Sequence, residues 1–347
     1  MTQPTLLATR TWPIAVQAVA VALVAYVGAG AAEIGLFRVF SPTESELAWV
    51  SDVLLSTALG VAVYLWRHLG ATRRTLADRE RAELVLRTQF EVAADLQRRL
   101  LPALPPADGT VEWAASLRSA GMIGGDFYDI VARPGTRHWM LLVADVSGKG
   151  IPAAMALSTL RASFRALASQ ELGPGAVLSQ LSSALHEQWS GIPYVTAIIV
   201  QVDVEAGTLR YANAAHPAAL IAGQGRLRAL EALGPPAAMF AGMTYEERRV
   251  AIAPGDVCVI VTDGVTEALG DDASDGIEAL MRTGETAPGI AGDVCDSVMA
   301  AAMRAPGPEG VADWDDDRTV VVMAVLDDAY EHVPVARAVV AVSGAAS

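Results

Sequence analysis

The chain has 347 residues, which is enough for two domains or for one large domain with appendages. Its 39 Asp and Glu residues outnumber its 25 Lys and Arg residues, and the formal net charge of −14 argues against nucleic acid as a partner. The two cysteines, Cys258 and Cys295, lack metal-ligand spacing and do not predict a disulfide framework.

The N-terminal part of the chain concentrates the apolar residues that raise the mean hydropathy to +0.35. Thr11–Ala32 contains no charged residue and is long enough for one bilayer span of ~20 residues. Leu47–Trp66 contains a single charge, Asp52, and is a second candidate span. We therefore predict a membrane anchor with two transmembrane helices over residues 1–66.

Basic residues lie outside the two candidate spans, at Arg10, Arg67, His68, Arg73 and Arg74. The positive-inside rule then places both ends of the anchor in the cytoplasm and predicts a cell inner (plasma) membrane protein. A cleaved signal peptide is the alternative, because residues 28–32 (Gly-Ala-Gly-Ala-Ala) resemble a small-residue cleavage region.

Residues 67–104 predict a linker helix, because the stretch after Trp66 is charged and lacks proline up to Pro102. A seam of residues, apolar except for Gln89, recurs at spacings of four and three: Ala82, Leu86, Gln89, Ala93, Leu96 and Leu100. This spacing is typical of a short coiled coil that would form a homodimer, or of one amphipathic helix lying on the next domain. Leu101–Pro106 ends the helix and marks a domain boundary.

From residue 105 to residue 328 the pattern predicts strands punctuated by turns, with a few helices. Expected strands are Trp139–Val146, Val195–Val204, Thr208–Asn213, Val257–Thr262 and Thr319–Leu326, and expected helices are Pro152–Ala168, Val177–Trp189 and Ala291–Met303. Hairpins without regular crossover helices favour an α+β fold with antiparallel sheets and helices packed outside. Residues 329–347 are expected to form a flexible tail.

Four aspartates lie at or near the ends of strands that are expected to be buried: Asp126, Asp145, Asp263 and Asp316. Each one alone has a structural explanation, because Asp favours turns and caps helices. If the fold brings them to one edge, the carboxylates would repel each other unless cations neutralise them. Oxygen ligands without His or Cys select Mg²⁺ or Mn²⁺, and two such ions would support hydrolysis of a phosphate ester.

Other motif interpretations fail on spacing. Ser147–Gly150 (Ser-Gly-Lys-Gly) is not a P-loop, because Val143 stands where its first glycine belongs. Gly-Gly-Asp-Phe is similar to the diguanylate cyclase signature, but the later motifs have no place in that enzyme. His216, which precedes a proline, is a candidate general acid or ligand, although a turn residue with local hydrogen bonds is the favoured interpretation.

Six ordered motifs between about Asp95 and Asp327 resemble the RsbU/SpoIIE-type PPM protein phosphatases. They read Leu-Gln-Arg-Arg-Leu-Leu-Pro, Gly-Gly-Asp-Phe-Tyr-Asp, Ala-Asp-Val-Ser-Gly-Lys-Gly-Ile-Pro-Ala-Ala, Tyr-Ala-Asn-Ala-Ala-His-Pro, Val-Thr-Asp-Gly-Val-Thr-Glu-Ala and Asp-Asp-Arg-Thr. The resemblance implies a sandwich of two antiparallel β-sheets flanked by helices, with a binuclear Mn²⁺ or Mg²⁺ site between the sheets. It also implies phosphoserine or phosphothreonine substrates, typically anti-anti-sigma (STAS) proteins.

Carried over by motif, the resemblance implies that Asp145 bridges two metal ions and that the Val146 carbonyl binds one of them. Asp126 would complete the shell of the second ion, while Asp263 and Asp316 would hold the first. Asp317 is the adjacent alternative to Asp316. Two further expectations are that Asp129 orients the turn or a water, and that Ala215 stands where the family usually has glycine.

The sequence thus predicts a membrane-anchored, metal-dependent serine/threonine phosphatase with its catalytic domain in the cytoplasm. The alternative from another class is a catalytically inactive module that binds a phosphoprotein. Four intact acidic positions disfavour this alternative, because binding alone does not need them all.

Overall fold

The computed structural model describes residues 44–105, 109–121, 124–133, 137–148, 150–189, 193–270, 276–278, 290–304, 316–326 and 337–342. The chain divides into two units, Met1–Leu84 and Val85–Ser347. The second unit contains both β-sheets and every candidate site residue.

One long helix, α2 (Glu44–Leu100), forms the described part of the first unit and continues into the second. No proline interrupts its 57 residues, and Pro102 follows its last turn. The second predicted span and the predicted linker are therefore parts of one helix, whereas the sequence indicated a boundary between them at Trp66.

No helix in the described part of the chain is long and apolar enough to cross a membrane. The second predicted span, Leu47–Trp66, forms part of α2. This stretch carries Asp52 and belongs to a helix that continues into a charged segment. The first predicted span, Thr11–Ala32, lies outside the described residues.

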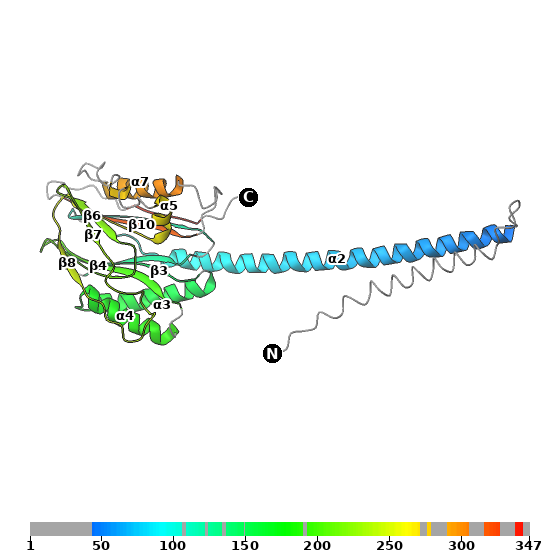
Figure 1. Cartoon of the computed structure of the whole chain (residues 1–347), viewed down its shortest axis with the longest axis horizontal. Helices are drawn as coiled ribbons and strands as arrows, with labels where there is room; N and C mark the ends of the chain where they lie inside the picture. Colours follow the sequence, from blue (N-terminus) through cyan, green and yellow to red (C-terminus); the bar gives the residue numbers. More distant parts are fainter. Residues whose placement is uncertain are drawn as a thin grey trace. The chain divides into compact units, whose positions relative to one another are not determined.

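Two β-sheets form the centre of the second unit (Figure 1). Sheet A has the strand order β11 (Arg337–Val342), β1 (Val111–Ser119), β10 (Arg318–Val325), β9 (Val257–Val261), β6 (Ala219–Gly223) and β7 (Arg226–Leu230). Sheet B has the order β2 (Asp126–Ala132), β3 (His138–Val146), β4 (Val195–Asp203), β5 (Thr208–Ala214) and β8 (Arg248–Ala251). Among these described strands, neighbours in a sheet pair antiparallel except for β1 and β11, which pair parallel.

Helices cover the outer face of each sheet (Figure 1). The helices α3 (Ile151–Ala168) and α4 (Pro174–Trp189) pack on sheet B, and α5 (Asp263–Leu269) and α7 (Ile290–Arg304) pack on sheet A. A third apolar cluster lies between the sheets and includes Trp113, Tyr128 and Met323. The architecture is thus four layers, and it confirms the expected α+β sandwich of two sheets flanked by helices.

The expected strands and helices of residues 105–328 are found within a few residues of their predicted bounds. The structure differs at the C-terminus, where a flexible tail was expected over 329–347. Arg337–Val342 forms β11, which pairs parallel to β1 from Ala114↔Arg337 to Ser119↔Val342. This segment is rich in valine, and its polar and apolar residues do not alternate. Its β-branched, apolar composition favours a strand, which here forms the edge of the sheet.

Candidate functional site

Two of the predicted ligands face each other across strands β2 and β3. Asp126 is the direct antiparallel partner of Asp145. Residues opposite each other in antiparallel strands point to the same face of the sheet. Tyr128 and Val143 lie two residues from Asp126 and Asp145 along the same strands, so they point to the same face of the sheet. Because Tyr128 and Val143 belong to the apolar cluster between the sheets, the two carboxylates also face the space between the sheets. Like charges placed directly opposite are unfavourable, so this pair needs compensation.

The glycine pair that precedes Asp126 allows three polar groups to approach the backbone closely. A Cβ atom added at Gly125 would lie 2.6 Å from Asp145 Oδ1 and 2.6 Å from the Val146 carbonyl oxygen. A Cβ atom at Gly124 would lie 2.1 Å from Asp317 Oδ2. The Val146 N–H also donates to the Gly125 carbonyl at 3.0 Å. Glycine is thus required here because any side chain would displace Asp145, Val146 or Asp317.

Asp126 is held by two hydroxyl groups from the other sheet. Thr262, at the end of β9, and Thr319, on β10, donate to Asp126 Oδ2 at 2.7 Å and 2.6 Å. All three residues are at most 1% exposed. Burial, and then the carboxylates of Asp317 and Asp145, raise the pKa of Asp126 well above its usual value, and the two hydroxyls oppose that shift. A cation between the sheets would relieve this repulsion.

The two threonines were not predicted from sequence, and we expect their removal to weaken the site. Thr262→Val and Thr319→Val should each lower the free energy of unfolding by about 1.5–3 kcal/mol, the usual value for a hydrogen bond to a charged group. The double variant should cost less than the sum, because both hydroxyls bind one oxygen. Chemical denaturation measures both effects. Thr208→Val is the control, because Thr208 lies at the end of sheet B away from Asp126. Equal losses of unfolding free energy in all three single variants would contradict the assignment.

Asp317, the alternative to Asp316, has a structural role. It is 6% exposed, and its Oδ1 accepts the Ala120 N–H at 2.8 Å while its Oδ2 accepts the Gly125 N–H at 2.5 Å. Burial raises the pKa of Asp317, and these backbone donors oppose the shift. Asp317 therefore fastens the turn before Asp126 to β10, which leaves the half-buried Asp316 as the better ligand candidate.

Asp263 and Asp316 lie at neighbouring strand ends of sheet A. Asp263 begins α5 directly after β9, and Asp316 lies two residues before β10. The two segments pack closely, since a Cβ atom at Gly264 would lie 2.1 Å from the Asp317 carbonyl oxygen. The structure thus brings Asp126 and Asp145 together on sheet B, and Asp263 and Asp316 into neighbouring segments of sheet A.

The four carboxylates do not form a complete ligand shell as they stand. Within the described ranges, no three His, Cys, Asp or Glu side chains come close enough together to hold a metal ion. The donors nevertheless fit Mg²⁺ or Mn²⁺. They are all oxygens, Asp145 Oδ1 and the Val146 carbonyl both approach Gly125, and burial together with the carboxylates of Asp317 and Asp145 raises the pKa of Asp126.

His216 is a buried turn residue, as the favoured interpretation of the sequence had it. Its N–H donates to Asn213 Oδ1 at 2.8 Å, and Asn213 Nδ2 donates back to the His216 carbonyl at 3.1 Å. Ala215 has a φ of 55°, in the left-handed region that favours glycine. This explains why a relative would place glycine before the histidine.

We expect the His216 imidazole to stay neutral at physiological pH and therefore not to act as a general acid. Burial lowers its pKa from 6.5 to about 3. Because the unfolded chain takes up the proton first, stability should fall as the pH drops from 6.5 towards 3. NMR titration of the ring nitrogens measures the protonation state. A ring that titrates near pH 6.5 in the folded protein would contradict the assignment.

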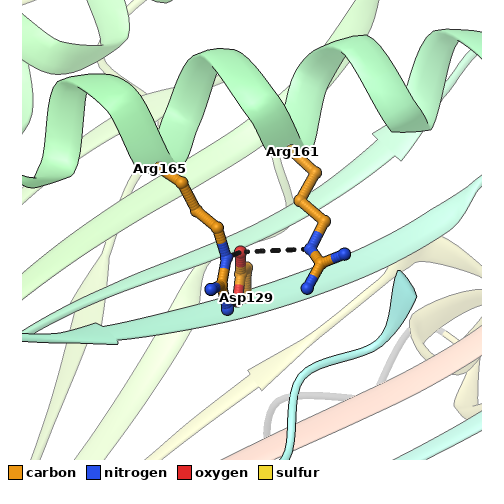
Figure 2. A network of polar contacts seen from close by, with 3 residues as sticks. All are labelled: Asp129, Arg161 and Arg165. Atoms are coloured by element: carbon orange, nitrogen blue, oxygen red, sulfur yellow. Dashed lines mark hydrogen bonds and ion pairs between the residues drawn. The ribbon is translucent and has the colours of Figure 1, made fainter. Parts of the chain in front are cut away.

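Asp129 binds an arginine of α3, whereas the sequence predicted that it orients the turn or a water. It lies on the face of β2 that packs against α3, and Arg165 of α3 binds it with two hydrogen bonds of 2.6 Å and 2.7 Å (Figure 2). Alternation along β2 puts it on the face opposite to Asp126.

Known proteins resemble this chain over the sandwich. The phosphoserine phosphatase RsbU of Bacillus subtilis (strain 168) is 26% identical over 184 residues, which cover 52% of this chain and 54% of that protein. The chain spans about half the length of the curated relatives it matches.

Two solved structures share the fold. The SiaA-PP2C domain of Pseudomonas aeruginosa has a TM-score of 0.57 and 20% identity, covering 71% of this chain and 99% of that one. The PP2C phosphatase domain of SpoIIE from Bacillus subtilis, with a fragment of its regulatory domain, has a TM-score of 0.54 and 17% identity, covering 62% and 64%. The model of the family described as Stage II sporulation protein E (SpoIIE) matches residues 135–326, so the chain belongs to the SpoIIE family.

Proposed function

We propose that this chain is a metal-dependent phosphoserine or phosphothreonine protein phosphatase. The observation that carries the proposal is the pair formed by the buried Asp126 and the half-buried Asp145, which oppose each other across β2 and β3 near the Val146 carbonyl. Asp263 and Asp316, at the adjoining strand ends of sheet A, would add two more oxygen donors. Membership of the SpoIIE family and the similarity to a phosphoserine phosphatase support the same activity.

The chemistry follows from the donor set. Two Mn²⁺ or Mg²⁺ ions held by Asp126, Asp145, Asp263, Asp316 and the Val146 carbonyl would supply an activated water and charge stabilisation for the phosphoryl group. The side chains of the protein position that chemistry. Thr262 and Thr319 hold the Asp126 carboxylate in one orientation, and Asp317 fastens the glycine turn that brings the backbone against Asp145. His216 is buried, and because burial lowers its pKa to about 3 we expect it to stay neutral and not to act as a general acid.

We further propose a phosphorylated STAS-domain protein as substrate, as the resemblance to the RsbU/SpoIIE-type phosphatases implies. Two curated relatives named phosphoserine phosphatases, RsbU and RsbP, support a phosphoserine substrate. The test is turnover of p-nitrophenyl phosphate and of a phosphorylated STAS protein by the full-length chain, with and without Mn²⁺. The phosphatase proposal predicts turnover that requires the metal. Tight binding of the phosphoprotein without any turnover would instead support the inactive binding module.

The location and assembly of the chain are separate proposals. The uncharged stretch Thr11–Ala32 supports attachment to the plasma membrane, with the sandwich in the cytoplasm. Release of the chain from the membrane fraction by detergent but not by salt is the expected result. The exposed apolar side chains on α2, among them Trp66, Leu69 and Leu76, support a homodimer formed through this helix. Sedimentation velocity of the full chain tests this.

A further inference from the structure

An ion pair between the buried Asp129 and the partly exposed Arg165 joins strand β2 to helix α3, behind the candidate metal site. Asp129 is 0% exposed, and Arg165 donates from Nε to its Oδ2 at 2.6 Å and from Nη2 to its Oδ1 at 2.7 Å. Figure 2 shows Arg165 and Arg161 reaching from the same face of α3 to this carboxylate. A buried carboxylate needs such a partner, and the two parallel hydrogen bonds fix direction as well as charge.

Arg161 is a second arginine close to the Asp129 carboxylate. Its Nε lies 3.8 Å from Asp129 Oδ2, within ion-pair range but too far for a hydrogen bond. This Nε is buried and has no hydrogen-bond partner in the described part of the chain. Arg161 and Arg165 are four residues apart, so they lie one helical turn from each other on one face of α3.

The elements joined by this pair both lead to candidate ligands. Asp129 lies three residues after Asp126 on β2. Helix α3 begins at Ile151, five residues after Val146, and Arg165 is in its last turn. The helix is therefore fixed at one end by the short loop that follows Val146, and at the other by the strand that carries Asp126. A change in the position of α3 against β2 would move these two ligand-bearing segments relative to each other.

We infer that Asp129 is a positioning residue for metal binding. Arg165, with Arg161 as a second cation nearby, holds α3 against β2 so that Asp126 and Val146 reach the same metal site. The inference rests on the proposed metal-dependent function. It differs from a purely structural role in one respect, because the pair should affect affinity for the metal in a protein that remains folded.

The experiment measures Mn²⁺ binding to the full-length chain by calorimetry, with circular dichroism to establish that each variant is folded. Asp129→Asn should raise the Kd for Mn²⁺ by about tenfold or more, the usual effect of losing an outer-shell partner. Arg165→Gln should raise it less, because Arg161 remains close to the carboxylate. The double variant Arg161→Gln/Arg165→Gln should match Asp129→Asn. Adding Arg165→Gln to Asp129→Asn should cause no further loss, because the two residues act as a unit.

Arg210→Gln is the matched control. Arg210 also lies on sheet B and also binds a carboxylate, that of Glu247, at 3.1 Å. The Glu247 side chain is 36% exposed, whereas that of Asp129 is 0% exposed. The Kd of this variant for Mn²⁺ should equal that of the parent. If Asp129→Asn does not fold, Arg165→Lys replaces it as the test of the positioning role. Lysine keeps the positive charge but cannot donate the two parallel hydrogen bonds of arginine.

The outcomes separate this inference from the proposed function. A parent chain that binds no Mn²⁺ would overturn the metal site and this inference with it. A parent that binds Mn²⁺, together with folded Asp129 and Arg165 variants whose Kd stays within about twofold of the parent, far below the usual outer-shell effect, would overturn only the positioning role.

Discussion

Replacing Asp145 with asparagine should lower Mn²⁺-dependent turnover of a phosphoserine substrate by at least about 100-fold, or about 2.7 kcal/mol of barrier. Asp145 directly faces Asp126, and its Oδ1 and the Val146 carbonyl both approach Gly125, so its charge is central to the proposed donor set. Asparagine keeps the shape of the side chain and removes that charge. The fold should stay intact, because removing one of two opposed carboxylates also relieves repulsion.

The measurement is the rate of phosphate release by the parent and the variant over a range of Mn²⁺ concentrations, alongside thermal melts without metal. Asp203→Asn, on the distant end of β4, is the control, and its turnover should equal that of the parent. Turnover by Asp145→Asn within about tenfold of the parent, about 1.4 kcal/mol, would contradict the role of Asp145.

Replacing Asp317 with alanine should lower the free energy of unfolding by about 3 kcal/mol. The change leaves the N–H groups of Ala120 and Gly125 without their acceptor. Each unsatisfied buried donor costs about 1–3 kcal/mol. The turn before Asp126 loses its attachment to β10, so stability and activity should fall together. Chemical denaturation by urea, followed by circular dichroism, gives the free energy.

Asp316→Ala is the comparison that separates the two neighbouring aspartates. Asp316 is half-buried, so its removal should cost less than about 1 kcal/mol of stability, as for a surface position. It should nevertheless abolish metal-dependent turnover. The reverse pattern, with a stable Asp317→Ala protein that is inactive and an unstable Asp316→Ala protein, would exchange the roles of the two residues.

Much of the fold was predictable because its strands are long and apolar. Val257–Val261 is a continuous apolar run two residues before Asp263, and Trp139–Ala144 is one that leads directly to Asp145; both lie in strands with a neighbour on each side. The helices α3 and α4 were also found, since Pro152 marks the first turn of α3. The strand β11 was missed because a sequence does not show which distant edge strand a short valine-rich segment will join.

The site was predictable in its carboxylates but not in their partners. Strand ends that carry Asp126 and Asp145 can be read from hydrophobic runs, whereas register decides that these two residues are directly opposed. The roles of Thr262 and Thr319 depend on contacts between the two sheets. These threonines are 136 and 193 residues from Asp126 in the chain. Both threonines stand inside the quoted motifs, in Val-Thr-Asp-Gly and Asp-Asp-Arg-Thr, and that position was the available signal.

The same limit applies to Asp129. Its spacing from Asp126 suggested a turn or a water, because the sequence does not show which helix will cover β2. In the structure, alternation along the strand turns Asp129 towards α3, and the two arginines of that helix compensate its charge.

The most direct test of a metal-dependent phosphatase site is a crystal structure of the chain grown with Mn²⁺ and analysed by anomalous scattering at the manganese edge. The account predicts two peaks, ~3.5–4 Å apart as in two-metal phosphatases, between the strand ends that carry Asp126 and Asp145 and those that carry Asp263 and Asp316. Their shells should include the Val146 carbonyl. A map without manganese at these strand ends, from protein that turns over phosphoserine in the same Mn²⁺ solution, would contradict it.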